Sequence, residues 1–168
     1  MLKYRDRPLD YLDLITEYQD IDFSVPPNSP KVKIALLADF ATQQFTAILK
    51  TLLYQSSINA EIYEAPFDSI DLEIYNPGSG LYVFQPDIIV LLGAVQKLRV
   101  RYFQAASKID FRDEEIRRAR SLLEAIRKNT QAVVLQSNYV LPLESLFGQL
   151  DAKMESSLYR IVQEVNVT

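Results

Sequence analysis

The chain has 168 residues and a formal net charge of −4, and it contains no His, Cys or Trp. Without imidazole or thiol groups it cannot build a Ser-His-Asp or Cys-His catalytic system, and zinc and iron–sulfur sites lose their usual ligands. The length predicts a single main domain. The net negative charge weighs against a nucleic-acid partner, because phosphate binding requires a basic surface.

No apolar segment approaches the ~20 residues that are needed to cross a bilayer. Residues 1–6 also lack the apolar core of a signal peptide. We therefore expect a cytoplasmic protein that has no membrane partner.

Residues 1–30 are predicted to form an N-terminal appendage and a connector. Leu9, Leu12 and Ile15 follow helical spacing and predict a short helix that packs on the main domain. Three prolines between residues 26 and 30 then interrupt regular structure. A loosely attached appendage is the alternative. The remaining residues, 31–168, are assigned to one α/β domain.

Strand-like and helix-like segments alternate within this domain. Apolar runs predict buried strands over residues 32–37, 59–63, 88–92 and 132–135. Periodic spacing predicts a helix over residues 42–56 with Thr42 as its cap, helical structure over 96–128, and a closing helix from Leu158 to Val165. This order predicts a three-layer α/β/α sandwich with a mainly parallel, flavodoxin-like sheet.

Two of these helices have a predicted buried face. The helix over residues 42–56 is expected to bury Phe45, Ile48, Leu49, Leu52 and Leu53. The helical segment over residues 96–128 is expected to bury Ile116, Ala119, Leu123 and Ile126.

Ligands of parallel sheets bind at the carboxyl ends of the strands. That rule selects the loops over residues 38–44, 93–96 and 136–139. The first loop has no glycine and therefore matches neither a P-loop nor a dinucleotide-binding turn. Its aspartate can serve as a loop hydrogen-bond acceptor, as a helix cap or as a metal ligand. The candidate cleft residues are Asp39, Phe40, Thr42, Gln43, Gly93, Gln96 and Asn138.

The segment from Lys97 to Lys128 carries ten Lys or Arg residues and five Asp or Glu residues. A solvated helix face accounts for most of these charges. The alternative is a basic surface that binds an acidic partner protein. Its candidate residues are Arg99, Arg101, Arg117, Arg118 and Arg120.

Two blocks of the sequence resemble those of SGNH hydrolases. The loop at Asp39 is similar to their opening Gly-Asp-Ser block, and residues 86–96 are similar to the block that ends Gly-x-Asn-Asp. The resemblance aligns Phe40 with the serine nucleophile and Val95 with the oxyanion-hole asparagine, and the chain has no His. Phe cannot attack an acyl carbon and Val cannot donate a hydrogen bond to an oxyanion. The resemblance therefore implies an SGNH-like sheet without the esterase reaction.

A closer resemblance is to the N-terminal, SGNH-like domain of FkbH-like proteins, which belong to subfamily IIIC of the haloacid-dehalogenase (HAD) phosphatase superfamily. It is carried by residues 33–44, 60–67, 81–87 and 147–150, followed by a helix that ends at Asn166. Better-known members load a glyceryl unit onto an acyl carrier protein, using a HAD-type domain with an Asp-x-Asp motif and magnesium.

This chain has no Asp-x-Asp block in the setting of a buried strand. The resemblance therefore implies an adjoining HAD-type domain in cis, an acyl carrier protein as a further candidate partner, and Mg²⁺ only in the downstream domain. We expect the chain to be one domain of a longer protein or a truncated relative.

Three functions follow from these observations. The leading hypothesis is a non-catalytic binding or scaffolding module. The second is a residual hydrolase or acyltransferase that uses Asp39 as base with Ser137 or Thr42, although a carboxylate of ordinary pKa is a poor base toward a hydroxyl. The third is an oligomerisation domain whose interface draws on ten Tyr and eight Phe residues.

Overall fold

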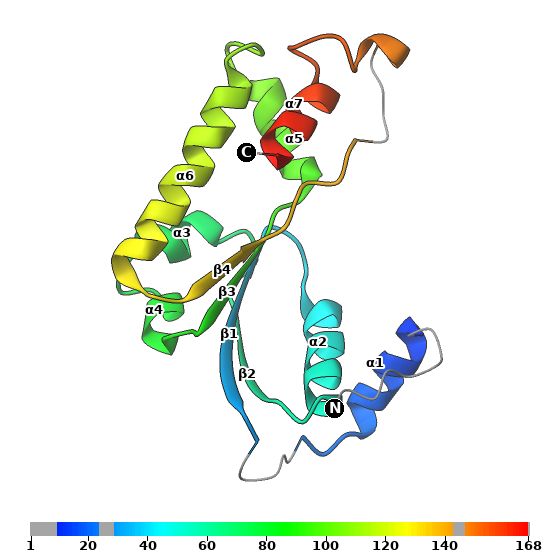
Figure 1. Ribbon diagram of the computed structural model, residues 1–168, viewed down its shortest axis with the longest axis vertical. Helices are drawn as coiled ribbons and strands as arrows, with labels where there is room; N and C mark the ends of the chain where they lie inside the picture. Colours follow the sequence, from blue (N-terminus) through cyan, green and yellow to red (C-terminus); the bar gives the residue numbers. More distant parts are fainter. Residues whose placement is uncertain (1–9, 24–28, 143–146, 168) are drawn as a thin grey trace.

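The computed structural model describes residues 10–23, 29–142 and 147–167 (Figure 1). Leu9 and two of the three connector prolines lie outside these residues. Among the described residues, no helix is both long enough and apolar enough to cross a membrane. The elements in chain order are α1 (Tyr11–Asp20), β1 (Lys31–Ala38), α2 (Gln43–Gln55), β2 (Asn59–Glu64), α3 (Ile70–Tyr75), α4 (Gly80–Phe84), β3 (Ile88–Leu92), α5 (Val95–Gln104), α6 (Phe111–Asn129), β4 (Val133–Gln136), the 3-10 turn η1 (Gly148–Leu150) and α7 (Leu158–Asn166).

The four strands form one sheet in the order β2-β1-β3-β4, and all neighbours are parallel. The predicted α/β class and parallel sheet are thereby confirmed. Ile34 lies opposite both Ile62 and Ile88, so the three strands place their apolar side chains in register. The strands are the predicted ones, with bounds that differ by one residue at some ends.

Helices lie on both faces of this sheet (Figure 1). One face packs against α3, α4 and α6. Its core consists of Ala35, Leu37, Ile74, Leu81, Ile89, Leu91, Leu122 and Ile126. On the other face α2 lies over β1 and β2, and α1 packs on the outer side of α2.

A second core lies beyond the carboxyl ends of the strands, between α5, the first turns of α6 and α7 (Figure 1). It consists of Leu98, Tyr102, Phe111, Leu158, Ile161 and Val162. Helix α6 contributes to both cores, with Phe111 in the second and Ile126 in the first. The closing helix is therefore confirmed, and α6 joins the sheet to the outer helices.

The structure corrects several predicted helix faces. The fully buried residues of α2 are Thr46, Ala47 and Thr51, whereas Phe45 is exposed. Small residues let a helix approach a sheet closely, so the larger side chains of α2 lie at the edges of the contact. In α1 the buried residue is Leu14, and Leu12 is exposed.

The basic segment over residues 96–128 is helical, as predicted, but it forms two helices with a break at residues 105–110. The predicted buried stripe of the second of them, α6, is partly wrong. Ile126 is buried as expected, but the other fully buried residues are Phe111, Glu115 and Leu122. The buried residues of α6 differ from the predicted stripe because the first turn of the helix packs in the second core and its last turns pack in the first.

Candidate binding site

A cleft of about 810 Å³ opens at the carboxyl ends of β1, β3 and β4. The loops after these three strands meet there because parallel strands end at the same edge of a sheet. The lining is mostly apolar. It consists of Phe40, Phe45, Leu92, Gly93, Ala94, Val95, Gln96, Arg99, Ser137, Asn138, Val140, Leu141 and Pro142.

The structure brings four of the seven candidate cleft residues into this lining, namely Phe40, Gly93, Gln96 and Asn138. Phe40 is 39% exposed and presents an aromatic face at the position where the SGNH resemblance has a nucleophile. A phenyl ring offers apolar contact area and no lone pair for attack. Phe40 therefore contributes apolar surface to the wall of the cleft.

Asp39 is not part of the cleft lining, and its side chain holds two loops together. Its Oδ1 accepts a hydrogen bond of 2.7 Å from the Ala94 backbone N–H. Burial raises the pKa of Asp39 above its ordinary value, and this hydrogen bond opposes the rise only in part. Asp39 lines a second, smaller cavity of about 50 Å³, together with Glu115, Arg118 and Tyr139. The carboxylate thus ties the loop after β1 to the loop after β3.

The two remaining candidates lie outside the cleft lining. Thr42 precedes α2 at the predicted cap position, but its side chain makes no cap hydrogen bond. Its hydroxyl donates instead to Oε2 of Glu64, 2.8 Å away, at the end of β2. Gln43 is exposed in the first turn of α2.

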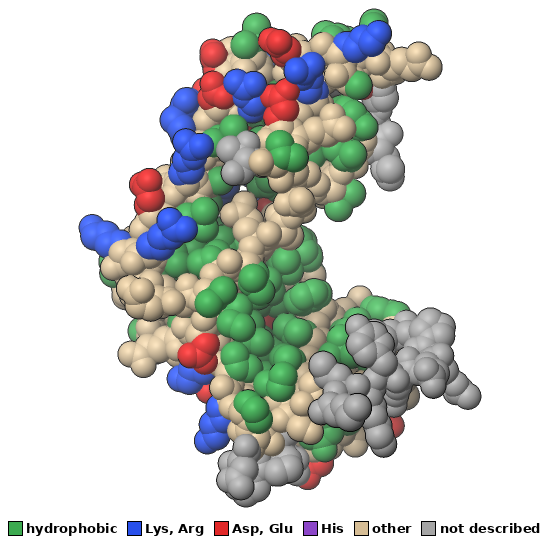
Figure 2. Space-filling model, in the orientation of Figure 1, with side chains coloured by type: hydrophobic (Ala, Val, Ile, Leu, Met, Phe, Trp, Pro, Cys, Tyr) green, Lys and Arg blue, Asp and Glu red, His purple; other side chains and the backbone are tan. Residues whose placement is uncertain are grey.

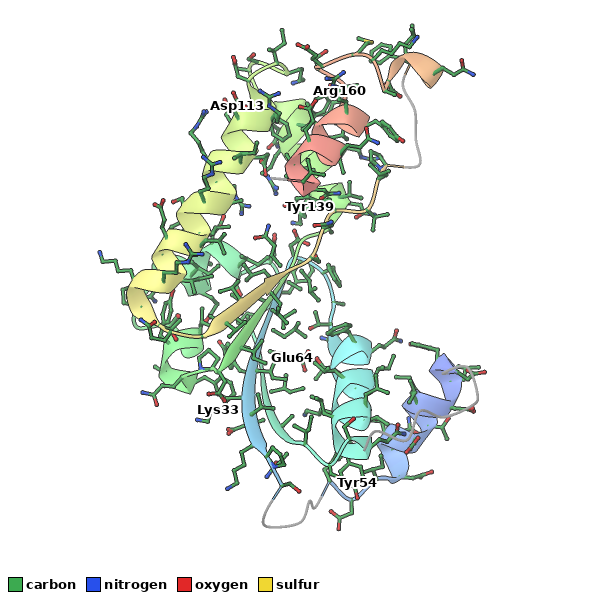
Figure 3. All side chains as sticks on the ribbon, in the orientation of Figure 1. Lys33, Tyr54, Glu64, Asp113, Tyr139 and Arg160 are labelled. Atoms are coloured by element: carbon green, nitrogen blue, oxygen red, sulfur yellow. The ribbon has the colours of Figure 1, made fainter. Side chains whose placement is uncertain are left out.

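Tyr139 lies on the chain that leaves β4, between the sheet and the outer helices (Figure 3). Its ring lies against Gly93 so closely that a Cβ added at Gly93 would be 2.8 Å from Cε1 of Tyr139. Asn166, at the end of α7, holds the Tyr139 backbone: Oδ1 accepts from the Tyr139 N–H, and Nδ2 donates to the Tyr139 carbonyl, each at 2.8 Å. The sequence analysis missed this contact, since no spacing rule links residues 139 and 166.

Arg101 and Glu115 form a buried ion pair between α5 and α6. Nε and Nη2 of Arg101 donate to the two carboxylate oxygens of Glu115 at 2.7 and 2.8 Å, and the Glu115 side chain is 7% exposed. Burial opposes the charge on Arg101, but the hydrogen bonds and charge of Glu115 outweigh it and raise the pKa of Arg101 above its usual range. Arg101, whose side chain is 29% exposed, is therefore engaged in an ion pair within the fold.

The other candidate partner-binding arginines occupy different surroundings. Nη2 of Arg118 donates to Asp71 of α3 at 2.7 and 3.0 Å. Arg99 lines the cleft. Arg117 and Arg120 are exposed on α6. The five arginines thus do not form one surface patch, because two of them face other elements of the fold.

Over residues 10–23, 29–142 and 147–167, no three acidic side chains are grouped closely enough to hold a metal ion. The cleft lining contains no carboxylate. The site is therefore a mainly apolar cleft with a few hydrogen-bonding groups at its rim.

The geometry defines an α/β domain with an all-parallel sheet and a mainly apolar cleft at its strand ends. Residues 33–168 match the family described as FkbH, N-terminal domain. The chain belongs to that family. No curated protein matches the sequence significantly.

One solved structure has the same fold with 24% sequence identity and a TM-score of 0.80. It is described as the N-terminal part of the protein BF1531 from Bacteroides fragilis, containing a phosphatase domain complexed with Mg. The match covers 95% of this chain and 41% of that one. The present chain thus corresponds to less than half of the related structure.

Proposed function

We propose that this domain is a non-catalytic binding and scaffolding module of a protein that also carries a phosphatase-type domain. The observation that carries the proposal is the mainly apolar cleft at the strand ends, which has an aromatic wall where the resemblance has a nucleophile. The family assignment and the longer, phosphatase-containing structure with the same fold support the setting.

We propose that the domain has an SGNH-like fold that lacks the nucleophile, the oxyanion donor and the base of the hydrolases. Phe40 and Val95 replace the nucleophile and the oxyanion donor, and the chain has no His to act as base. Asp39 contributes one carboxylate oxygen to the Ala94 N–H and is thereby engaged in loop structure. Each change removes a different part of the reaction, so the cleft is suited to binding.

Ester hydrolysis tests the non-catalytic part of the proposal. We expect p-nitrophenyl butyrate to hydrolyse no faster with the chain than in buffer. Ser137 and Asp39 both line the smaller cavity, so Ser137→Ala and Asp39→Asn are the informative variants. Turnover by the native chain that either variant abolishes would establish a residual hydrolase in place of a binding module.

The scaffolding part is tested on the complete polypeptide. We expect its reading frame to encode a phosphatase-type domain with an Asp-x-Asp motif, and we assign Mg²⁺ to that domain. Deleting residues 1–168 should lower the thermal midpoint of the phosphatase-type domain by about 4 °C or more, because a domain contact is lost. An unchanged midpoint, or a frame without such a domain, would contradict scaffolding.

We propose an acyl carrier protein as a second partner, and the exposed arginines of α6 support this proposal. Arg117 and Arg120 are exposed, so they can steer an acidic protein by long-range attraction. A carrier-protein titration at low and high salt should show binding that weakens with salt and with Arg117→Glu/Arg120→Glu. Lys153→Glu, a charge reversal at an exposed residue far along the chain, is the control. Salt-independent binding, or no binding, removes this partner.

A further inference from the structure

One half of the sheet face that carries α2 is exposed. The register pairs Ile88 with Val133 and Val90 with Leu135, so all four side chains lie on this face. Val133 and Leu135 are 59% and 53% exposed, whereas Ile89 and Leu91, which point to the opposite face, are buried. Figure 2 shows the resulting area of hydrophobic side chains in the middle of the molecule.

Parallel sheets are normally covered by helices on both faces. In the described part of the chain, α2 covers β1 and β2, and no helix lies over the β3–β4 half of that face (Figure 1). Helices that pack on a sheet lie about 10 Å apart, roughly the width of two strands. The uncovered area thus corresponds to one missing helix beside α2.

The shape of this exposed area favours one kind of binding partner over another. The exposed face continues into the 810 Å³ cleft, between Phe45 of α2 and Leu141. The surface is hollowed there, and the molecule is concave on this side (Figure 2). Two copies of a concave surface cannot fill one another, whereas a rod with an apolar stripe can lie in it.

The near absence of charged side chains on this surface also favours a helix with an apolar stripe. The four face residues are aliphatic, and the cleft lining contains one charged side chain, Arg99. An amphipathic helix brings a stripe of apolar residues at i, i+3, i+4 and i+7 to such a groove and keeps its polar face in water.

We propose that the β3–β4 face receives an amphipathic helix from the remainder of the FkbH-like polypeptide, which completes the helix layer beside α2. The inference rests on the proposed function and names the surface through which the module holds the phosphatase-type part. The related structure supports it, because most of that chain lies outside the part that matches this domain.

The native chain contains no cysteine, so a single introduced thiol reports exposure at one place. Leu135→Cys places the thiol on the proposed surface. Val83→Cys is the matched control, because Val83 is an aliphatic residue that is 75% exposed on α4, in the opposite layer. Both variants are made in the 168-residue chain and in the complete polypeptide, and maleimide labelling is followed on the labelled peptide by mass spectrometry.

We expect L135C to label at least about tenfold more slowly in the complete polypeptide than in the 168-residue chain, and V83C to label equally in both. Equal labelling of L135C in both would overturn the docking surface while leaving scaffolding intact. A reading frame without a further domain would instead remove the proposed function. Concentration-dependent protection in the 168-residue chain alone would assign the face to a second copy and overturn the helix.

Discussion

The side-chain amide of Asn166 holds the backbone of Tyr139 through two hydrogen bonds, one donated and one accepted, each 2.8 Å long. The amide of Asn166 pairs with Tyr139 as a neighbouring strand would. The contact joins the end of α7 to the chain that leaves β4, and it sets the Tyr139 ring over Gly93. The position of Tyr139 beside Gly93, a residue of the cleft lining, thus depends on a residue at the far end of the chain.

Asn166→Ala should lower the free energy of unfolding by about 1–3 kcal/mol, because it leaves two backbone groups of a half-buried residue without their partner. Denaturant titration measures the change. Asn129→Ala is the control: its Nδ2 donates to the Ala125 carbonyl on an exposed helix end. An Asn166→Ala effect no larger than that of Asn129→Ala would show that the Asn166 contact adds nothing to stability.

Glu115→Ala should destabilise the protein by about 1–3 kcal/mol, since it leaves the half-buried Arg101 guanidinium without its carboxylate partner. Replacing both partners, by Arg101→Met with Glu115→Leu, should recover most of the loss because no charge remains buried. The exposed pair of Arg118 with Asp71 provides a comparison, and Asp71→Ala should cost under about 1 kcal/mol. Similar losses for Glu115→Ala and Asp71→Ala would contradict the role of burial.

Gly93→Ala should cost about 1–3 kcal/mol, because the new methyl group would lie 2.8 Å from the Tyr139 ring. Removing the ring with Tyr139→Ala should make the Gly93 substitution nearly neutral, which a double-mutant cycle measures. At Gly78 an added Cβ meets only Asn76 Oδ1 at 3.5 Å, so Gly78→Ala serves as the control. Additive effects of the Gly93 and Tyr139 substitutions would refute the contact.

Asp39→Asn tests the raised pKa of the Asp39 carboxyl. Burial, the largest cause, makes the folded state bind this proton more tightly than the unfolded state, whose pKa is near 3.8. The protonated Asp39 carboxyl therefore contributes stability to the folded protein below about pH 3.8. This contribution is lost as pH rises through the pKa that Asp39 has in the folded state. The free energy of unfolding of Asp39→Asn should therefore increase relative to that of the native chain as pH rises above about 3.8.

Denaturant titrations from pH 3 to 7 measure the difference in unfolding free energy between Asp39→Asn and the native chain. The amide oxygen of the introduced Asn still accepts the hydrogen bond from the Ala94 N–H. Asp113→Asn is the control of opposite sign. Hydrogen bonding to Arg112 lowers the pKa of Asp113, so its contribution is present at higher pH and is lost as pH falls. A pH-independent difference for Asp39→Asn would contradict the buried-carboxyl interpretation.

Helix α2 shows where sequence patterning fails. The apolar spacing correctly predicts a helix, but it assigns the sheet contact to Phe45 and its periodic neighbours, whereas Thr46, Ala47 and Thr51 are buried. Apolar residues that recur every 3.6 positions identify the apolar stripe of a helix. They do not identify which residues of that stripe contact the sheet. The larger side chains of α2 are exposed at Phe45 and half-buried at Ile48, Leu49, Leu52 and Leu53.

Site residues on the loops at the strand ends were predictable, and contacts between residues far apart in the chain were not. The rule for parallel sheets located Phe40, Gly93, Gln96 and Asn138 at one edge. The pairing of Arg101 with Glu115 and of Asn166 with Tyr139 depends on how α5, α6 and α7 pack beyond that edge. The sequence therefore left the basic segment as a solvated helix face or a binding patch, and only the structure pairs one of its arginines with Glu115.

The sequence by itself determined the parallel α/β class, the loops that meet at the strand ends, the family, and the loss of the chemistry that needs His and Cys. Strand runs and helical periods depend on neighbours in the chain, so they are readable from spacing. Only the tertiary structure decided the cleft, the contact of the Tyr139 ring with Gly93 and the uncovered β3–β4 face. Those features depend on which helix covers which face, and long-range packing sets that choice.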